Sequence, residues 1–482
     1  MDNKNYQLRL FPITILLLFL TVIGLRLDNF ANDPGLGWHI KTGEYILQNL
    51  KLPVEDPFSF TNFSGKWLID QWLADILISS IFSALGWPFL YVLLVIIFVY
   101  TYGVKQYSKL TKIYGNYLLA ALVVMYSFYF AQVHFICRPV LFSFFFFLLL
   151  FYQLYSFSKL ATAPKSLYLK IFITIAFWAN MHPSFVIAWG LFAVALIASF
   201  LAKDACKKYL RLSLVMLLAT LLNPYGFELY YTVLSLSVSQ IVDPSYSEWE
   251  SVSFSLLHDG FFALPSILLL IIICIQSKFI QKYAYFILSF LLFSLLANKA
   301  VRFLPYFGIT SAPILMLTVP ILFQRLSDSR SKVMEVLGIA WKRLEYKESL
   351  SRLGVPIFVL CSVGLLISAL FLQKIPLYNG EYGPTTTRYS KKSLDYLLSQ
   401  NRSVRVINDS NLGGYLIGWG KGRVKGLLDD RTTMHGTDVY AYYNRQLRSE
   451  NIFNLAKILD ADYLLLSNGK RYKELVLSLI HI

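Results

Sequence analysis

Long apolar runs alternate with short polar gaps along most of this chain. Three of the runs occupy residues 13–23, 140–152 and 267–275. Extended by neutral neighbours, such runs reach the roughly 20 residues with which a helix crosses about 30 Å of hydrocarbon. Helices satisfy their own backbone hydrogen bonds, which the interior of a bilayer demands. The pattern therefore predicts a polytopic α-helical membrane protein.

Two stretches need a decision between a membrane crossing and another arrangement. Residues 171–201 are long enough for two short crossings, and the polar stretch 180–184 contains Pro183, which interrupts helical hydrogen bonding. We expect a break there, with its turn facing outward. Residues 68–85 contain Asp70 and Asp75, so we expect this stretch to lie along the outer membrane surface.

Beyond Gln373 the apolar runs give way to Asn, Gly, Ser, Lys and Asp. The change predicts a separate α/β domain of about a hundred residues, an ordinary domain size, at 374–482. Its periodicities predict helices at 391–400, 440–448 and 453–459 and strands at 403–408, 424–428 and 463–467. We expect the apolar ending, residues 474–482, to be a buried C-terminal helix.

Composition agrees with a membrane protein. Of the 482 residues, 56% are hydrophobic and only 15% are charged, and the mean hydropathy is +0.54. A soluble domain could not bury so much apolar surface. The four cysteines, Cys137, Cys206, Cys274 and Cys361, are scattered in or beside apolar segments, which supports neither a disulfide framework nor a zinc site.

The formal charge of +16 arises largely from basic residues in the short gaps between apolar runs. Basic gaps lie at 105–112, 159–170, 203–211, 278–282 and 325–352, whereas acids occupy the gaps at 28–56 and 243–259. Membrane proteins keep Lys and Arg on the cytoplasmic side, so this pattern predicts about eleven crossings. The N terminus would be cytoplasmic, with a large first outer loop at 27–86 and the domain at 374–482 also outside. We interpret the first apolar run as an anchor and expect no nucleic-acid partner.

A set of polar residues falls at the predicted outer membrane boundaries, where ionisable groups are costly unless paired or used. From the first loop come Asp33, His39, Asp56 and Asp70, and from later boundaries come His134, Arg138, His182, Asn223, Tyr225, Glu248, Lys299 and Arg302. Asp33 stands out because it precedes a helix-like segment just after the first apolar run. The structural alternatives to a functional role are a turn or helix cap for Asp33, interfacial side chains for the arginines, and a polar helix break for His182.

Several short motifs carry a family resemblance through their order along nearly the whole chain. They are Asp33-Pro34-Gly35-Leu36-Gly37-Trp38-His39, Asp56-Pro57-Phe58-Ser59, Arg138-Pro139-Val140-Leu141, Trp178-Ala179-Asn180-Met181-His182, Leu222-Asn223-Pro224-Tyr225-Gly226, Arg302-Phe303-Leu304-Pro305, Asn408-Asp409 with Gly413-Gly414-Tyr415-Leu416, and Asp429-Asp430-Arg431-Thr432. The chain resembles bacterial GT-C membrane glycosyltransferases, in particular uncharacterised proteins with an Asp-Pro-Asp-Leu-Trp-Trp-His opening motif. We interpret Asp429-Asp430-Arg431 itself as a strand end with a local ion pair.

The resemblance implies a sugar donor carried on polyprenyl phosphate, a cell-envelope acceptor, and a site on the outer face of the bacterial inner membrane. It implies that Asp33 accepts the proton of the attacking hydroxyl, or organises a metal, in an inverting displacement. Arg138 and Arg302 would bind the leaving phosphate, because guanidinium offers two parallel donors to phosphate oxygens. His39 and His182 would bind acceptor or phosphate, and Asp56, Asp70 and Glu248 would complete the substrate site.

The chain departs from the family motif at three positions. Gly35 replaces the second aspartate, Gly37 replaces a tryptophan, and Gln71 stands where a glutamate is expected. A paired-carboxylate metal site at this motif is therefore weakened, and either no cofactor or a divalent metal, Mg²⁺ or Mn²⁺, is expected. Both a metal-independent enzyme and a diverged member without activity stay open.

Other function classes compete with the transferase. A non-catalytic scaffold or glycan-binding protein is kept open by Gly35 and Gly37. An O-antigen ligase or polymerase is a close enzymatic alternative that would rely on outer-loop Arg and His. A transporter is less favoured, because it would place ionisable groups near the bilayer midplane and often shows inverted repeats.

Overall fold

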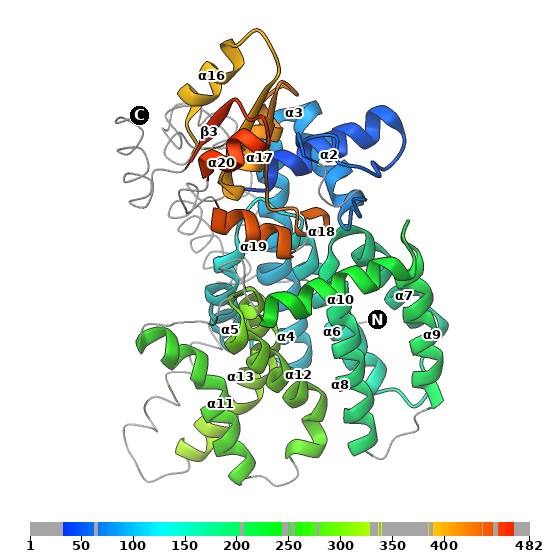
Figure 1. The fold of residues 1–482 in the computed structure, drawn as a ribbon. Coiled ribbons are helices and arrows are strands. Elements are labelled where there is room, and N and C mark those ends of the chain that lie inside the picture. The colour runs from blue at the N-terminus through cyan, green and yellow to red at the C-terminus, as the bar shows by residue number, and fades with distance from the viewer. Residues whose placement is uncertain are drawn as a thin grey trace.

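A computed structural model describes most of the chain. The described residues are 32–61, 66–202, 207–242, 249, 251, 256–275, 279–327, 336, 339, 384, 389–435, 437–446 and 452–466. The first apolar run, the proposed boundary at 373 and 374, and the apolar ending at 474–482 lie outside them. In Figure 1 a bundle of helices fills the lower part, and a smaller α/β region lies above it beside α2 and α3.

The first loop and the bundle contribute twelve described α-helices. They are α2 (Leu36–Asn49), α3 (Trp72–Val99), α4 (Gln106–Tyr114), α5 (Tyr117–Ala131), α6 (Val140–Ser158), α7 (Lys165–Met181), α8 (Ile187–Leu201), α9 (Lys207–Leu221), α10 (Phe227–Val242), α11 (Leu256–Ile275), α12 (Phe279–Lys299) and α13 (Leu304–Ser327). A π-helical segment, Tyr100–Lys105, joins α3 to α4. Gly86 kinks α3 with a φ of 75°, a conformation that favours glycine.

Six helical stretches among the described residues are long and apolar enough to cross a bilayer. They are Phe89–Tyr114, Tyr117–His134, Val140–Ser158, Pro183–Leu201, Ile280–Lys299 and Val301–Gln324. The shorter α7 and α9 expose apolar side chains at every fourth position, such as Ile173 and Phe177 on α7 and Leu214 and Leu218 on α9. Such stripes suit lipid contact. The protein is a helical membrane protein, and the count of about eleven crossings stays a prediction.

The expected break within 171–201 is present. Helix α7 ends at Met181, His182 has extended backbone angles, and a 3₁₀ turn at Pro183–Val186 leads into α8. Residues 68–85 overlap the first part of α3, where the helical stretch Trp72–Trp87 is apolar but shorter than the six stretches above. Its position along the outer membrane surface stays a prediction.

Lysines from four of the predicted basic gaps meet at one end of α6. Lys159 Nζ donates to the carbonyl of Lys282 (3.1 Å), Lys208 Nζ donates to the carbonyl of Leu160 (2.6 Å), and Lys109 Nζ lies 5.7 Å from the centre of the Tyr152 ring. The 19 residues of α6 make a helix about 28 Å long, close to the thickness of a bilayer core. Arg138, just before α6, therefore lies at the opposite end from these lysines.

The described part of residues 389–466 forms an α/β region, and a separate domain over 374–482 stays a prediction. Its described elements are α16 (Lys391–Ser399), β1 (Val404–Asn408), α17 (Ser410–Trp419), β2 (Val424–Gly426), α18 (Thr432–His435), α19 (Thr437–Gln446), α20 (Ile452–Ile458) and β3 (Tyr463–Leu465). The three strands are parallel in the order β2-β1-β3, with Val404 opposite Val424 and Val406 opposite Tyr463. The sequence patterns missed α17 and α18.

Glycines allow α2 to pack between α3 and α17 at very short range. A Cβ on Gly37 would lie 1.9 Å from the carbonyl oxygen of Gly414, and one on Gly43 would lie 2.1 Å from that of Asp75. Real Cβ atoms do not approach so closely, so only glycine permits these crossings. They fix the first loop between the bundle and the α/β region.

Candidate active site

Asp33 lies buried where the chain turns into α2. Its Oδ1 accepts a hydrogen bond from the backbone N–H of Gly35 (2.8 Å), and its Oδ2 forms an ion pair with Arg138 Nε. The carboxylate side chain is only 1% exposed. The Asp-Pro turn, one of the alternatives to a functional role for Asp33, is therefore present, and the second oxygen is also held by a guanidinium.

Arg138 joins the first loop to the α/β region. It immediately precedes Pro139 and the start of α6, and its side chain is 23% exposed. Besides the Asp33 contact, Arg138 Nη2 donates to Asp430 Oδ2 (2.9 Å). The other oxygen of Asp430 accepts from Trp38 Nε1 on α2 (2.8 Å). Two carboxylates from distant parts of the chain thus share one guanidinium.

Asp430 titrates unlike an exposed acid. Burial raises its pKa to about 6, because the Arg138 guanidinium and the Trp38 indole only partly offset the desolvation and the charges of Asp33 and Asp429. A carboxyl group with a pKa near 6 exchanges protons close to neutral pH.

His39, one turn into α2, lies deep beside this cluster. Its Nδ1 is 2.6 Å from Asp75 Oδ1 on α3, and the side chains are 2% and 0% exposed. Burial, then the charges of Arg138 and His182, lower the pKa of His39 well below its usual value. Burial and Asp70 raise the pKa of Asp75. Asp75 orients the imidazole, which stays uncharged at neutral pH.

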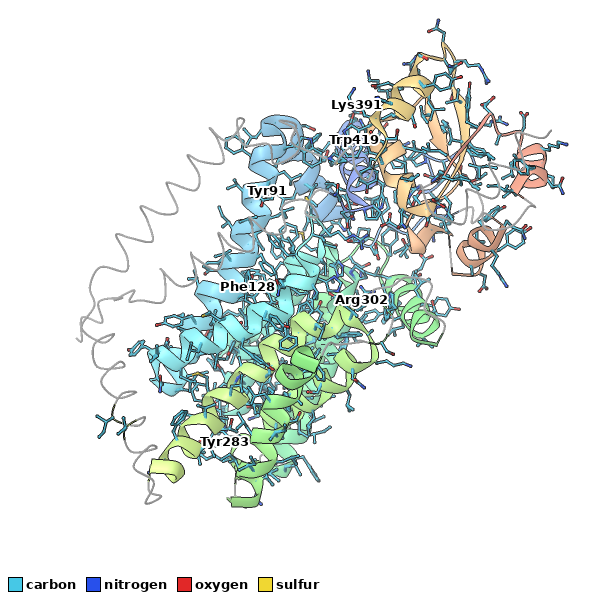
Figure 2. All side chains as sticks on the ribbon, turned by 90° about the vertical axis from the view of Figure 1, so that its left-hand side faces the viewer. Tyr91, Phe128, Tyr283, Arg302, Lys391 and Trp419 are labelled. Atoms are coloured by element: carbon cyan, nitrogen blue, oxygen red, sulfur yellow. The ribbon has the colours of Figure 1, made fainter. Side chains whose placement is uncertain are left out.

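His182 and Arg302 lie at the same end of the bundle. His182 Nδ1 is 2.9 Å from Ser184 Oγ, which also accepts a hydrogen bond from the hydroxyl of Tyr306 (3.2 Å). Arg302 precedes Tyr306 by one helical turn, and its guanidinium lies 4.2 Å from the centre of the Trp249 ring. Figure 2 shows Arg302 toward the α/β region, well away from Tyr283 near the start of α12.

Asp70 lies close to Asp75, the partner of His39. Gln71 Nε2 is 3.4 Å from Asp70 Oδ1, and burial raises the pKa of Asp70 to about 7. The charge of Asp70 reaches Asp75 and the hydroxyl of Tyr225. Gln71, where a glutamate was expected, thus donates to this neighbouring acid.

Asp56 belongs to a different buried cluster. Its two oxygens accept from Arg431 Nη1 and Nη2 (2.8 and 3.1 Å), and the backbone N–H groups of Phe58 and Ser59 also bind it. Arg431 is bound as well to Asp429 (2.6 Å). The predicted ion pair at the strand end is therefore formed by Asp429 and Arg431. With its oxygens so engaged, Asp56 fastens the first loop to the α/β region.

The structure thus brings Asp33, His39, Arg138 and His182 together, with Arg302 and Asp70 close by and Asp56 in the Arg431 cluster. Glu248 lies outside the described residues. Reasoning from the sequence missed Trp38, Asp75 and Asp430 as members of the site. Asp430 stood inside a quoted motif, but its neighbours gave no sign that it would face α2 and not Arg431.

The acidic residues described here do not by themselves form a metal site. No group of three or more His, Cys, Asp or Glu side chains in the described ranges is arranged to hold a metal ion. The carboxylates of Asp33 and Asp430 are bridged by Arg138, so a guanidinium occupies the position between them. Mg²⁺ or Mn²⁺ dependence stays a prediction.

No family model and no curated protein matches this chain. A similar solved structure is the crystal structure of the Archaeoglobus fulgidus oligosaccharyltransferase in the apo form, with a TM-score of 0.59 and 12% sequence identity. The match covers 94% of this chain and 69% of that chain. The chain shares its fold. A fold similar to that of a membrane glycosyltransferase is what the sequence motifs suggested.

Proposed function

We propose that the protein is a membrane glycosyltransferase. It would move a sugar from a polyprenyl-phosphate carrier to a glycan, lipid or protein acceptor on the outer face of the bacterial inner membrane. The observation that carries the proposal is the buried Asp33 and Arg138 pair at one end of α6, in a fold shared with an oligosaccharyltransferase. An acid beside an arginine at a membrane boundary suits chemistry on a lipid phosphate.

The reaction proposed is a single displacement with inversion. The acceptor hydroxyl attacks the anomeric carbon, the bond from that carbon to the phosphate oxygen breaks, and the lipid phosphate leaves with the bonding electrons. Asp33 takes the hydroxyl proton. For this to occur, the donor phosphate must replace a carboxylate on Arg138, so that one guanidinium serves the carboxylate before binding and the phosphate afterwards.

The remaining residues would position the substrates. Arg302, whose guanidinium lies over the Trp249 ring, would take a second phosphate oxygen. His39 stays neutral and is oriented by Asp75, which suits a hydrogen bond to a sugar or acceptor hydroxyl. His182, tied to Ser184, would serve the same face.

The side of the membrane on which the site lies is proposed from the positions of the lysines. The lysines gathered at the far end of α6 suit the cytoplasmic face, and the site end would then face outward. This arrangement favours a transferase over a transporter, because the ionisable groups lie at the two ends of α6 and not at its middle.

The test is sugar transfer by the purified full-length protein in lipid. Radiolabelled sugars on polyprenyl phosphate are supplied with a cell-envelope extract, with and without divalent metal, to wild type, Asp33→Asn and Glu55→Gln. Glu55 is an exposed acid of the same loop and serves as the matched control. We expect Asp33→Asn to lower the rate by about 10²- to 10⁴-fold, the range for loss of a general base.

Equal turnover by Asp33→Asn and wild type would remove Asp33 from the mechanism. Failure of wild type across a broad donor panel would favour a binding or scaffold protein. The metal arms test the Mg²⁺ or Mn²⁺ requirement directly.

A further inference from the structure

Asp430 reaches the site from the far end of the chain. Its contacts with Trp38 and Arg138 join residues 392 and 292 positions apart. It also lies against Gly35: a Cβ built on Gly35 would be 2.9 Å from Trp38 Nε1, 3.0 Å from Asp430 Oδ2 and 3.2 Å from Asp33 Oδ1. The Asp430 carboxylate and the Trp38 indole therefore border the space that a side chain at position 35 would enter.

The cluster carries one negative charge in excess when all three groups are ionised, since Asp33 and Asp430 oppose a single Arg138. An arriving phosphate adds more negative charge to a buried site, which costs free energy unless one carboxylate is displaced or protonated. Asp33 is held by the backbone of Gly35 as well as by Arg138. Asp430 is held by Arg138 and the Trp38 indole.

We propose that Asp430 is a positioning residue of this site, which holds Arg138 when no donor is bound, yields it to the donor phosphate, and retakes it as the lipid phosphate leaves. The inference rests on the proposed function. It makes the site a joint product of the first loop and the α/β region, with the carboxylate beside Asp33 supplied by Asp430 and not by position 35. The raised pKa of Asp430 fits this role, because the group takes up a proton readily when negative charge arrives.

The first experiment measures donor binding without turnover. The probe is farnesyl methyl phosphate, added to wild type, Asp430→Asn and Asp438→Asn in lipid nanodiscs. Its single phosphodiester charge is constant between about pH 5 and pH 8, unlike that of a monoester, whose second pKa lies near 6. Asp438→Asn makes the same change at an exposed position in α19. The groups facing Asp430 are Arg138, Asp33, Asp429 and the Trp38 indole, and all of these are retained in every variant.

We expect Asp430→Asn to bind the probe about tenfold more tightly than wild type at pH 8, because a competing carboxylate is gone. Wild-type affinity should rise as the pH falls through about 6, where Asp430 becomes protonated, and the variant should lack this rise. Equal affinity and an equal pH profile in the two proteins would overturn the inference, as would a loss of thermal stability with unchanged affinity.

The second experiment relocates the carboxylate. Gly35 has φ −86° and ψ −15°, which any L-residue adopts. Gly35→Asp combined with Asp430→Gly therefore places an acid beside the same space, with a small shift of the Trp38 indole, whose Nε1 lies 2.9 Å from the new Cβ. In the transfer assay, Asp430→Asn should lower both KM and kcat, since phosphate binds more tightly and leaves more slowly. The relocated variant should recover most of the wild-type kcat relative to Asp430→Gly alone.

Failure of the relocated variant to recover transfer, while it stays folded and binds the probe as wild type does, would count against Asp430 as a movable carboxylate. If wild type neither binds the probe nor transfers sugar, the proposed function fails. If wild type does both and Asp430→Asn behaves identically, only this inference fails.

Discussion

The pKa values of the buried acids described here depend on the balance between burial and the charges that face each carboxylate. Burial alone raises the pKa of each, because a low-dielectric interior disfavours the charged form. At Asp56 and Asp429 the Arg431 guanidinium outweighs burial and holds the pKa below its usual value. Asp70 and Asp75 lack such a partner, and their pKa values are raised. The same residue type is thus an anchor in one cluster and a proton-binding group in the other.

Asp70→Asn should stabilise the protein at alkaline pH. The folded-state pKa of about 7 lies above the usual value near 4, so folded Asp70 binds a proton that the unfolded chain has lost. Its contribution to stability is fully present below about pH 4 and is lost as the pH rises through about 7. The amide carries no charge, so the variant should gain up to about 4 kcal/mol at pH 8 but only about 1–2 kcal/mol at pH 5.

Thermal unfolding in detergent at both pH values measures this effect. Asp438→Asn, an exposed acid, should show no such pH dependence. An equal shift at pH 5 and pH 8 would contradict the raised pKa. The transfer rate of the same variant tests whether Asp70 also binds substrate.

At the scale of elements, α2 is held by close backbone crossings. Gly37 meets Gly414 of α17, and Gly43 meets the Asp75 backbone of α3. Asp33, Trp38 and His39 stand at the start of α2, so the distances in the site depend on how closely these helices approach. Gly37, where the motif that this chain resembles has a tryptophan, therefore allows the close packing of the first loop against the α/β region.

Gly37→Ala should force α2 and α17 apart, because its Cβ would lie 1.9 Å from the Gly414 carbonyl oxygen. We expect destabilisation by about 1–3 kcal/mol, as in other overpacked sites, together with loss of transfer. Gly190→Ala in α8 is the matched control, since its Cβ would make only an ordinary contact with Leu292 at 3.5 Å. That control should be neutral or stabilising by about 1 kcal/mol. Similar unfolding temperatures for the two variants would contradict the crossing.

At the scale of the whole molecule, two arginines join segments far apart in the sequence. Arg138 connects the start of α6 to the first loop and to the α/β region, and Arg431 connects the α/β region to the first loop. Arg431 is fully buried, and its guanidinium also lies 4.5 Å from the centre of the Trp67 ring. The α/β region is therefore part of the site's framework and not an independent attachment.

Arg431→Met should leave Asp56 and Asp429 buried without their cation. The expected loss is about 3–5 kcal/mol, the range for breaking a buried ion pair, and replacing both acids by Asn as well should recover part of it. Because the folded-state pKa values of both acids are lowered, the stabilisation by this cluster is present above about pH 4 and is lost as the pH falls further. Differential scanning fluorimetry with Arg405→Met, an exposed arginine, as control measures the effect. An unfolding temperature equal to that of the control would show that the cluster contributes little.

The sequence by itself determined the helical membrane character, the break at His182, most of the elements of the α/β region, and a set of polar residues that includes Asp33, His39 and Arg138. These follow from local periodicity, proline chemistry and the cost of polar groups at a membrane. Helix α17 was missed because its glycines argue against a helix until α2 lies against them. Only the tertiary structure decided which acids meet a guanidinium and that Asp430 faces Trp38, 392 positions away. Such contacts depend on how helices and domains pack, and no local pattern in the sequence predicts which residues so far apart will meet.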